Sequence, residues 1–224
     1  MLKVLYEDNH LIAVYKPAGV LSQGDKSRDV PIIDQVKEYI KNKYNKPGDV
    51  FLGLAHRLDR PVSGLILLAR TSKALSRCNQ LFKDRNIEKT YFAIVEEKPS
   101  NPKGSLVHYI KKDTVKNKAR LFDKEKDGAK KALLEYTLIS TSKSSHLIEV
   151  KPKTGRPHQI RAQLASMGCV IKNDVKYGAK SSNNPKQIYL HAKSLSFEHP
   201  VKRIPLFIEC PLPNDLEWKK YSYV

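Results

Sequence analysis

The sequence predicts an α+β fold, in which a mainly antiparallel mixed sheet is flanked by a few helices. Short apolar segments typical of strands recur along the whole chain, whereas only three segments repeat apolar residues at helical spacing. The gaps between strands are often of hairpin length, which favours antiparallel pairing. Because no repeat and no Pro/Gly/Ser-rich linker interrupts the 224 residues, we expect a single domain over residues 1–224.

The first half of the chain is expected to alternate between strands and helices. Pro31 is placed to begin an amphipathic helix that Pro47-Gly48 ends, and Ser72 is placed to cap a second helix. The expected strands cover residues 4–6, 11–15, 51–55 and 65–69. The last two strands enclose a polar loop and would hold both of its ends.

The second half of the chain is expected to be richer in strands. Pro157 opens a short helix with Ile160 and Leu164 on its inner face, and Gly168 is placed to end it. Between Lys111 and Lys131, nine Lys or Arg against four Asp or Glu predict a basic hairpin or loop. The expected strands lie at 91–95, 106–110, 133–139, 147–150 and within 188–210.

The composition points to a polyanionic partner. Lys and Arg number 41 against 23 Asp and Glu, which gives a formal net charge of +18 at pH 7. This exceeds the magnitude of roughly 2–8 that keeps a small domain soluble, so nucleic acid is the favoured partner and an anionic membrane the second. A lysine-rich surface that is merely solvated is the alternative.

No targeting or membrane-spanning segment is recognisable. The longest apolar run, 65–69, has five residues, whereas a membrane span needs roughly 20. Glu7 and Asp8 interrupt the only stretch that resembles a signal-peptide core. We therefore expect a cytoplasmic protein with no membrane partner.

Metal and cofactor chemistry is not expected. Cys78, Cys169 and Cys210 are far apart and lack C-x-x-C spacing, which indicates reduced core thiols rather than disulfides or zinc ligands. The seven histidines form no H-x-x-x-H or H-E-x-x-H arrangement, and the glycine-rich phosphate-binding motifs are missing.

The loop from His56 to Gly64 is the strongest candidate for a catalytic site. It places one carboxylate, Asp59, among two arginines and a histidine. Nearby cations favour the ionised carboxylate and lower its pKa, which suits nucleophilic or general-base catalysis. A salt-bridged turn is the structural alternative. The flanking strands favour catalysis, because they would present the loop on a rigid scaffold.

Two further segments carry candidate site residues. The segment from Lys151 to Arg161 is basic and runs into a helix, so it offers cations and backbone N–H groups to phosphates, unless it is only a solvated hairpin tip. Arg161 falls near the buried side of that helix, where a carboxylate is its expected partner. Lys89-Thr90-Tyr91 is a weaker signal, since Tyr91 either stacks on an unpaired base or is a core residue.

Together these motifs resemble those of the RluA-type pseudouridine synthases over nearly the whole chain. The resemblance implies the pseudouridine synthase catalytic fold and the conversion of specific uridines to pseudouridine in structured RNA, either tRNA or ribosomal RNA, without cofactor or metal. The small N-terminal RNA-binding domain of many relatives is not expected, and a monomer would suffice. The blocks that carry the resemblance are Leu5 to Gly19, His56 to Gly64, Lys89 to Tyr91, Thr154 to Gly178, and Leu190 to Ala192 with His199-Pro200.

The resemblance also implies a role for each site residue. Asp59 would be essential: the uridine is flipped out, its glycosidic bond is broken, and the uracil is rejoined through ring carbon 5. Whether Asp59 adds to the sugar or removes a ribose proton stays open. Tyr91 would stack on the uracil and serve in the last deprotonation, and Arg161 would pair with Asp59. The residues expected to bind substrate are Arg57, which would fill the gap left by the flipped base, and His56, Arg60, Lys89, Arg156, His158, Gln159, Ile160 and Leu164.

Three positions depart from the family's pattern without removing a proposed catalytic group. Val62, Gln163 and Asn173 stand where many relatives carry threonine, histidine and glycine, and these changes bear on loop packing or RNA choice. An RNA-binding protein that needs no turnover is the alternative from another class. Glycoside hydrolysis is disfavoured, because it needs paired carboxylates and the loop offers one.

Overall fold

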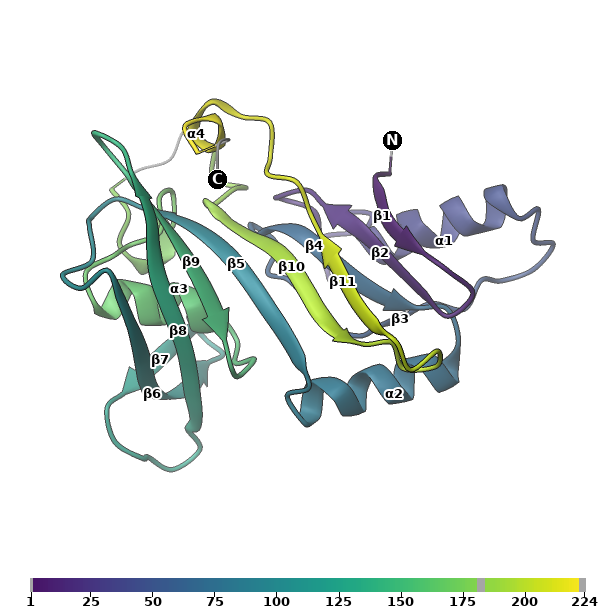
Figure 1. Ribbon diagram of the computed structural model, residues 1–224, viewed down its shortest axis with the longest axis horizontal. Helices are drawn as coiled ribbons and strands as arrows, with labels where there is room; N and C mark the ends of the chain where they lie inside the picture. The colour runs from purple at the N-terminus through teal and green to yellow at the C-terminus, as the bar shows by residue number, and fades with distance from the viewer. Residues whose placement is uncertain (1, 181–183, 222–224) are drawn as a thin grey trace. The chain divides into compact units, whose positions relative to one another are not determined.

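The computed structural model describes residues 2–180 and 184–221, which divide into two compact units (Figure 1). Unit 1 comprises Met1–Ile87 and Ala192–Pro211, and unit 2 comprises Glu88–His191 and Leu212–Val224. Each unit combines antiparallel strands with helices, which confirms the α+β prediction. The single domain expected over the whole chain stays a prediction.

Unit 1 is built on an antiparallel sheet. Strand β2 pairs with both β1 and β4, β3 pairs with the end of β4, and β10 pairs with β11. The strands are β1 (Val4–Glu7), β2 (Leu11–Lys16), β3 (Gly53–Leu54), β4 (Ser63–Ala69), β10 (Leu190–Glu198, in unit 1 from Ala192) and β11 (Pro205–Glu209), and the helices are α1 (Ile32–Lys43) and α2 (Ser72–Lys83).

Strand β4 is the buried centre of unit 1, and every one of its residues is buried. Side chains alternate between the two faces of a strand. Leu65 and Leu67 therefore belong to the apolar cluster that includes α2, whereas Ile66 and Leu68 belong to the cluster that includes α1. This double burial explains why the sequence of β4 is apolar without interruption.

Unit 2 contains a five-stranded antiparallel arrangement in the order β5-β9-β8-β6-β7. Its α3 lies against β6 and β7, and it also contributes to a cluster with β8. The elements are β5 (Ile87–Val95), β6 (Lys103–Asp113), β7 (Lys118–Phe122), β8 (Lys130–Thr141), β9 (His146–Pro152), α3 (Gln159–Ser166), a 3₁₀ turn η1 (Val175–Tyr177) and α4 (Leu216–Lys219).

The two faces of the unit 2 sheet are covered by different helices. On one face, Ala162 of α3 packs with Ala132 and other small apolar residues. The cross-strand register places Phe92 on the opposite face, where Trp218 of α4 and Tyr221 cover it. The C-terminal segment thereby completes the core of unit 2.

The predicted elements are largely confirmed, with several differences in detail, among them α4 and η1, which were not predicted. The helix α2 is capped by Thr71, whose Oγ1 accepts a hydrogen bond from Ala74 N at 3.1 Å, and not by Ser72. The strand expected at 51–55 is reduced to Gly53–Leu54. The basic stretch 111–131 forms a hairpin, one of the two forms expected, in which the end of β6 pairs with β7. Helix α3 begins at Gln159, two residues after Pro157.

Two expectations drawn from composition can be compared with the described residues. All three cysteines are buried free thiols, as predicted. Within residues 2–180 and 184–221, no helix combines the length and apolar character that crossing a bilayer requires.

Asp8 ties the turn between β1 and β2 to the turn that follows β10. Burial alone would raise the pKa of Asp8, but hydrogen bonds, led by the one from Lys202, outweigh it and hold the pKa well below its usual 3.8. The groups around the carboxylate are the backbone N–H of His10 and Leu11 at 2.8 Å, Tyr6 Oη at 2.9 Å, Lys202 Nζ at 2.8 Å and His199 Nε2 at 3.0 Å.

Asp8→Asn is expected to destabilise the protein in a pH-dependent way. A carboxylate whose pKa is depressed by folding stabilises the fold above its unfolded pKa, and this contribution is lost as the pH falls. The substitution should lower the free energy of unfolding by about 2 kcal/mol at pH 7 and by progressively less at acid pH. Urea denaturation at pH 7 and pH 3 measures both values. Asp49→Asn, at an exposed position, is the control, and a penalty equal at both pH values would contradict this role.

Candidate active site

The loop that carries Asp59 lies in unit 1 between β3 and β4. Asp59 follows the buried Leu58, and its C=O accepts a hydrogen bond from Val62 N at 3.0 Å, which closes a tight turn. Asp59 is partly exposed and Arg57 is exposed. The buried residues on both sides, Leu58 and Val62, fix the turn in the core and leave the charged residues near the surface.

The basic neighbours of Asp59 anchor the loop by different contacts. Nε2 of His56 accepts a hydrogen bond from Leu67 N at 3.1 Å, and its ring packs against Phe82 with centroids 5.2 Å apart. Arg60 donates from Nε to Gly19 O at 2.9 Å and forms an ion pair with Asp29. His56 and Arg60 thus have structural contacts of their own, and their roles in substrate binding stay predictions.

Gly64 at the end of the loop is required by its surroundings. Its φ is +122°, and a Cβ placed on it would lie 2.4 Å from both N and O of Ala192. No larger residue fits there without moving the backbone of β10. The glycine therefore allows β4 to begin immediately after the loop that carries Asp59.

In unit 2, the register of the sheet places Tyr91 on the face that α3 covers. Tyr91 pairs with Val150, Val150 pairs with Tyr136, and Tyr136 shares the face of Ala132, which packs with α3. Lys89, two residues before Tyr91, lies on the same face, and its Nζ is 3.5 Å from Thr154 O. Tyr91 and Lys89 therefore lie on the same side of the sheet as α3, which carries Arg161.

Arg161 is held by a carboxylate that lies beyond α3. Its Nε and Nη2 donate to Asp174 Oδ2 and Oδ1 at 2.7 and 2.8 Å, and the two side chains are only 5% and 1% exposed. This is the bidentate geometry that orients a guanidinium most strictly. The expected carboxylate partner is present within unit 2, while the pairing of Arg161 with Asp59 stays a prediction.

The ring of Tyr177 also contacts the Arg161 guanidinium. The Arg161 guanidinium carbon lies 5.2 Å from the centroid of the Tyr177 ring. The Tyr177 hydroxyl accepts from Ala119 N at 2.8 Å and lies 3.1 Å from Nδ1 of His158. His158 precedes α3 with a left-handed backbone, φ 51°. Tyr177 therefore links β7, the start of α3 and Arg161.

Gln159 fixes the basic loop before α3. Its Oε1 accepts from Thr154 Oγ1 at 2.8 Å and from Arg156 N at 3.0 Å, and its Nε2 donates to Leu133 O at 3.1 Å. Nε of Arg156 donates to Lys131 O at 3.0 Å. Gln159 is buried, so its visible role is to hold this loop against β8.

The two apolar residues predicted to bind substrate differ in exposure. Leu164 is fully buried, whereas Ile160 keeps 8% of its surface exposed. Of the pair, Ile160 is thus the one that retains surface to contact a ligand.

Asp174 was assigned no role of its own from the sequence. The signal for it lies in the charge pattern, because the stretch from Val150 to Lys172 has no acidic residue and Asp174 is the first acid after Arg161. A buried arginine in such a stretch needs an acid from outside it.

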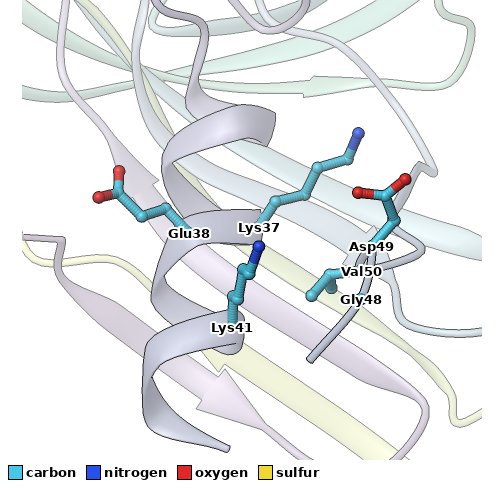
Figure 2. A pocket seen from close by; sticks show the side chains of 6 residues that line it. All are labelled: Lys37, Glu38, Lys41, Gly48, Asp49 and Val50. Atoms are coloured by element: carbon cyan, nitrogen blue, oxygen red, sulfur yellow. The ribbon is translucent and has the colours of Figure 1, made fainter. Parts of the chain in front are cut away.

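Among the described residues, neither a metal cluster nor the surface pocket of unit 1 marks this site. Among the described residues, no group of three or more His, Cys, Asp or Glu is arranged to hold a metal ion. A surface pocket in unit 1 lies between α1 and residues 48–50, and none of the predicted site residues lines it (Figure 2). Its lining residues are Lys37, Glu38, Lys41, Gly48, Asp49 and Val50.

Comparison with known proteins identifies the class. The family model described as RNA pseudouridylate synthase matches residues 10–166, a range that includes Asp59, Tyr91 and Arg161. The chain therefore belongs to the RNA pseudouridylate synthase family. It is an isomerase that acts on RNA, and the resemblance inferred from the motifs is confirmed.

Individual relatives agree with this assignment. The chain is 34% identical over 215 residues to ribosomal large subunit pseudouridine synthase C of Rickettsia typhi, covering 94% of this chain and 68% of the relative. It is 32% identical over 202 residues to ribosomal large subunit pseudouridine synthase D of Borreliella burgdorferi, covering 88% and 61%. The structure of human RNA pseudouridylate synthase domain containing 4 has a TM-score of 0.79 and 25% identity, covering 95% of this chain and 89% of that one.

Asp174→Asn is expected to destabilise unit 2 strongly. The change removes the bidentate counter-charge of the buried Arg161 and presents an amide N–H₂ to its guanidinium, which costs about 3–5 kcal/mol of unfolding free energy. Chemical denaturation measures the loss. Asp123→Asn, at a carboxylate whose side chain is 97% exposed, is the matched control and should change stability by less than about 0.5 kcal/mol. Equal stability of the two variants would show that the Arg161–Asp174 pair does not hold unit 2 together.

Proposed function

We propose that this enzyme converts one or more uridines of large-subunit ribosomal RNA to pseudouridine, with Asp59 as the essential residue. The choice of RNA rests on the relatives, which carry the name ribosomal large subunit pseudouridine synthase and are 29–34% identical to this chain over the aligned residues. The choice of Asp59 rests on its place in a turn that buried residues hold on both sides.

The three catalytic residues have separate tasks in this proposal. Asp59 promotes cleavage of the bond between the ribose and the ring nitrogen. Tyr91 stacks on the uracil and assists the final deprotonation at ring carbon 5. Arg161 pairs with Asp59 and orients it. The bidentate contact with Asp174 supports the last task, because it uses Nε and one Nη2 hydrogen and leaves the Nη1 hydrogens directed elsewhere.

The remaining predicted residues bind the RNA. Arg57 fills the space that the flipped uridine leaves in the stack, and its exposure supports this task. His56, Arg60, Lys89, Arg156, His158, Gln159, Ile160 and Leu164 shape or support the binding surface. His56, Arg60 and Gln159 do so by holding the loops on which the contacting residues lie.

The excess positive charge positions the RNA. The β6–β7 hairpin and the following residues, 111–131, hold nine Lys or Arg, and the stretch 150–172 holds five with no acid. Lys116, Arg120 and Lys124 are exposed. Such side chains contact phosphates and supply the free energy that flipping a base costs.

Transfer RNA is the alternative substrate, and we expect the enzyme to act as a monomer.

The alternative function is an RNA-binding protein without turnover. Such a protein would not need the Asp59 carboxylate, so a substitution of Asp59 distinguishes it from the enzyme.

Asp59→Asn is expected to abolish pseudouridine formation without preventing RNA binding. The amide keeps the shape of the side chain but cannot act as a nucleophile or a base, so the rate should fall by at least about 10³-fold. The measurement maps pseudouridine in ribosomal RNA and tRNA from a deletion strain complemented with wild type, Asp59→Asn or the control Asp49→Asn. Pseudouridine restored by Asp59→Asn would refute the role of Asp59. If wild type restores pseudouridine in tRNA but not in ribosomal RNA, the ribosomal substrate is refuted.

The affinity for RNA is expected to depend steeply on salt. With about six phosphate contacts, a plot of log affinity against log salt should have a slope of about −4 to −5. Filter binding of wild type between 50 mM and 300 mM salt measures the slope. Lys116→Ala should reduce its magnitude by about 0.7–0.9, whereas Lys46→Ala, in unit 1, should not change it. A slope near zero for wild type would remove the electrostatic role of the basic surface.

A further inference from the structure

Residues 22–31 form a surface loop of unit 1 whose two ends are joined. The N–H of Ile32 donates to Leu21 O at 2.8 Å, so the chain leaves and re-enters the core of the unit at one place. Every residue from Gln23 to Val30 is exposed. Compact surface loops with closed ends are frequently functional. Because residues 23–30 bury no side chain, polar contacts hold this part of the loop in place.

Two carboxylates of this loop interact with Arg60. Asp29 forms an ion pair with Nη2 of Arg60, and Ser27 Oγ donates to the same Asp29 oxygen at 3.1 Å. Asp25 accepts a hydrogen bond from Ser27 N at 2.7 Å. The pKa of Asp25 lies below its usual value mainly because of hydrogen bonds from Ser27 and, to a smaller extent, because of the positive charge of Arg60. Both acids of the loop are thus near enough to Arg60 to interact with its charge.

The guanidinium of Arg60 is oriented by the protein and still accessible. Its Nε donates to Gly19 O at 2.9 Å, which fixes the plane of the group. The side chain of Arg60 is 37% exposed and that of Asp29 is 54% exposed. A planar guanidinium presents N–H groups that fit the oxygens of carboxylates and of phosphates alike. The position that Asp29 occupies on Arg60 therefore also suits a phosphate oxygen.

The ion pair between Arg60 and Asp29 is of a kind that another anion can replace. Ion pairs between exposed side chains stabilise a protein little, because water and salt screen them. Release of Asp29 would break no apolar contact of the exposed stretch 23–30. Arg60 directly follows Asp59 in the chain, and RNA carries a phosphate at every nucleotide. An RNA strand whose target lies at Asp59 thus brings phosphates close to Arg60.

We propose that Arg60 binds a phosphate of the substrate RNA next to the target nucleotide, and that Asp29 occupies this site when RNA is absent. The inference rests on the proposed function, which places the target uridine at Asp59. It adds a ligand to Arg60, whose contact with Gly19 is structural. When RNA binds, the phosphate takes the place of the Asp29 carboxylate. Part of the attraction between Arg60 and RNA is therefore offset by the lost ion pair, so the loop lowers the affinity for RNA.

The test measures Kd for a transcript of large-subunit ribosomal RNA by filter binding. Asp29→Asn should tighten binding by about 3- to 5-fold, because the phosphate no longer competes with a carboxylate for Arg60. The matched control is Asp49→Asn, which removes one negative charge at another exposed position of unit 1. The control should change Kd by less than about 1.5-fold, because salt screens a distant exposed charge.

A second variant separates competition at Arg60 from a general effect of charge. Arg60→Gln should weaken binding and reduce the magnitude of the salt slope by about 0.7–0.9, because one phosphate contact is lost. A residue that only held the loop would not change the slope in this way. Adding Asp29→Asn to Arg60→Gln should then leave Kd within about 1.5-fold, because the site for which Asp29 competes is gone.

Three results would overturn the phosphate site. Asp29→Asn could bind RNA no more tightly than Asp49→Asn, or its gain could persist in the Arg60→Gln background. Weaker binding by Asp29→Asn would show that Asp29 orients Arg60 for RNA and does not compete with it. If Arg60→Gln does not fold, Asp29→Asn decides alone, since it changes an exposed residue.

Failure of this inference is distinguishable from failure of the proposed function. A wild type that binds RNA but forms no pseudouridine in any RNA overturns the proposed function. An active wild type whose Kd is unchanged by Asp29→Asn overturns only the phosphate site at Arg60.

Discussion

Burial of β4 on both faces is the constraint on which unit 1 depends. A strand that faces apolar side chains on both sides cannot slip by one residue or move outward without exposing several of them. Its first residues, Ser63 and Gly64, are therefore fixed, and the loop that ends there is fixed with them. The candidate catalytic aspartate thus has a well-defined position although it lies in a loop. The buried strand fixes the end of the loop, and the short turn places Asp59 near the surface only a few residues away.

In unit 2, the candidate site residue Arg161 is fixed by another means, since it lies on a helix that is itself buried. Residues 159–164 of α3 are all buried, although three of the six are polar or charged. Each of these three has defined partners: Gln159 holds the preceding loop, Arg161 holds Asp174, and Gln163 donates to Leu106 O at 2.9 Å. Buried polar groups with defined hydrogen-bond partners specify one arrangement strongly, because most alternatives would break those bonds. The helix is therefore held by specificity of hydrogen bonding as much as by apolar contact.

The sequence was sufficient to predict most elements and the loop of Asp59, because local signals determine them. Apolar runs, prolines at helix starts and glycines at helix ends are short-range features, and the candidate catalytic loop is recognisable by its mixture of charges between two strands. Contacts between distant residues could not be predicted in this way. Asp174 lies 13 residues from Arg161, and Lys16 lies 44 residues from Arg60, so nothing local marks them as partners. The cap of α2 shows a finer limit, since Thr71 and Ser72 are equally good candidates by type and only geometry distinguishes them.

The charged residues of the β6–β7 hairpin also affect how the protein behaves when no RNA is bound. Strand β7 is at the end of the strand order of unit 2, and one side of its backbone pairs with no described strand, although Ala119 N donates to the Tyr177 hydroxyl. Charged side chains such as Lys118 and Arg120 make such pairing unfavourable, because two copies would bring like charges together. The charge that attracts a polyanion thus also disfavours strand pairing at the edge of β7. RNA bound to the hairpin would neutralise this charge and would also cover the edge of β7.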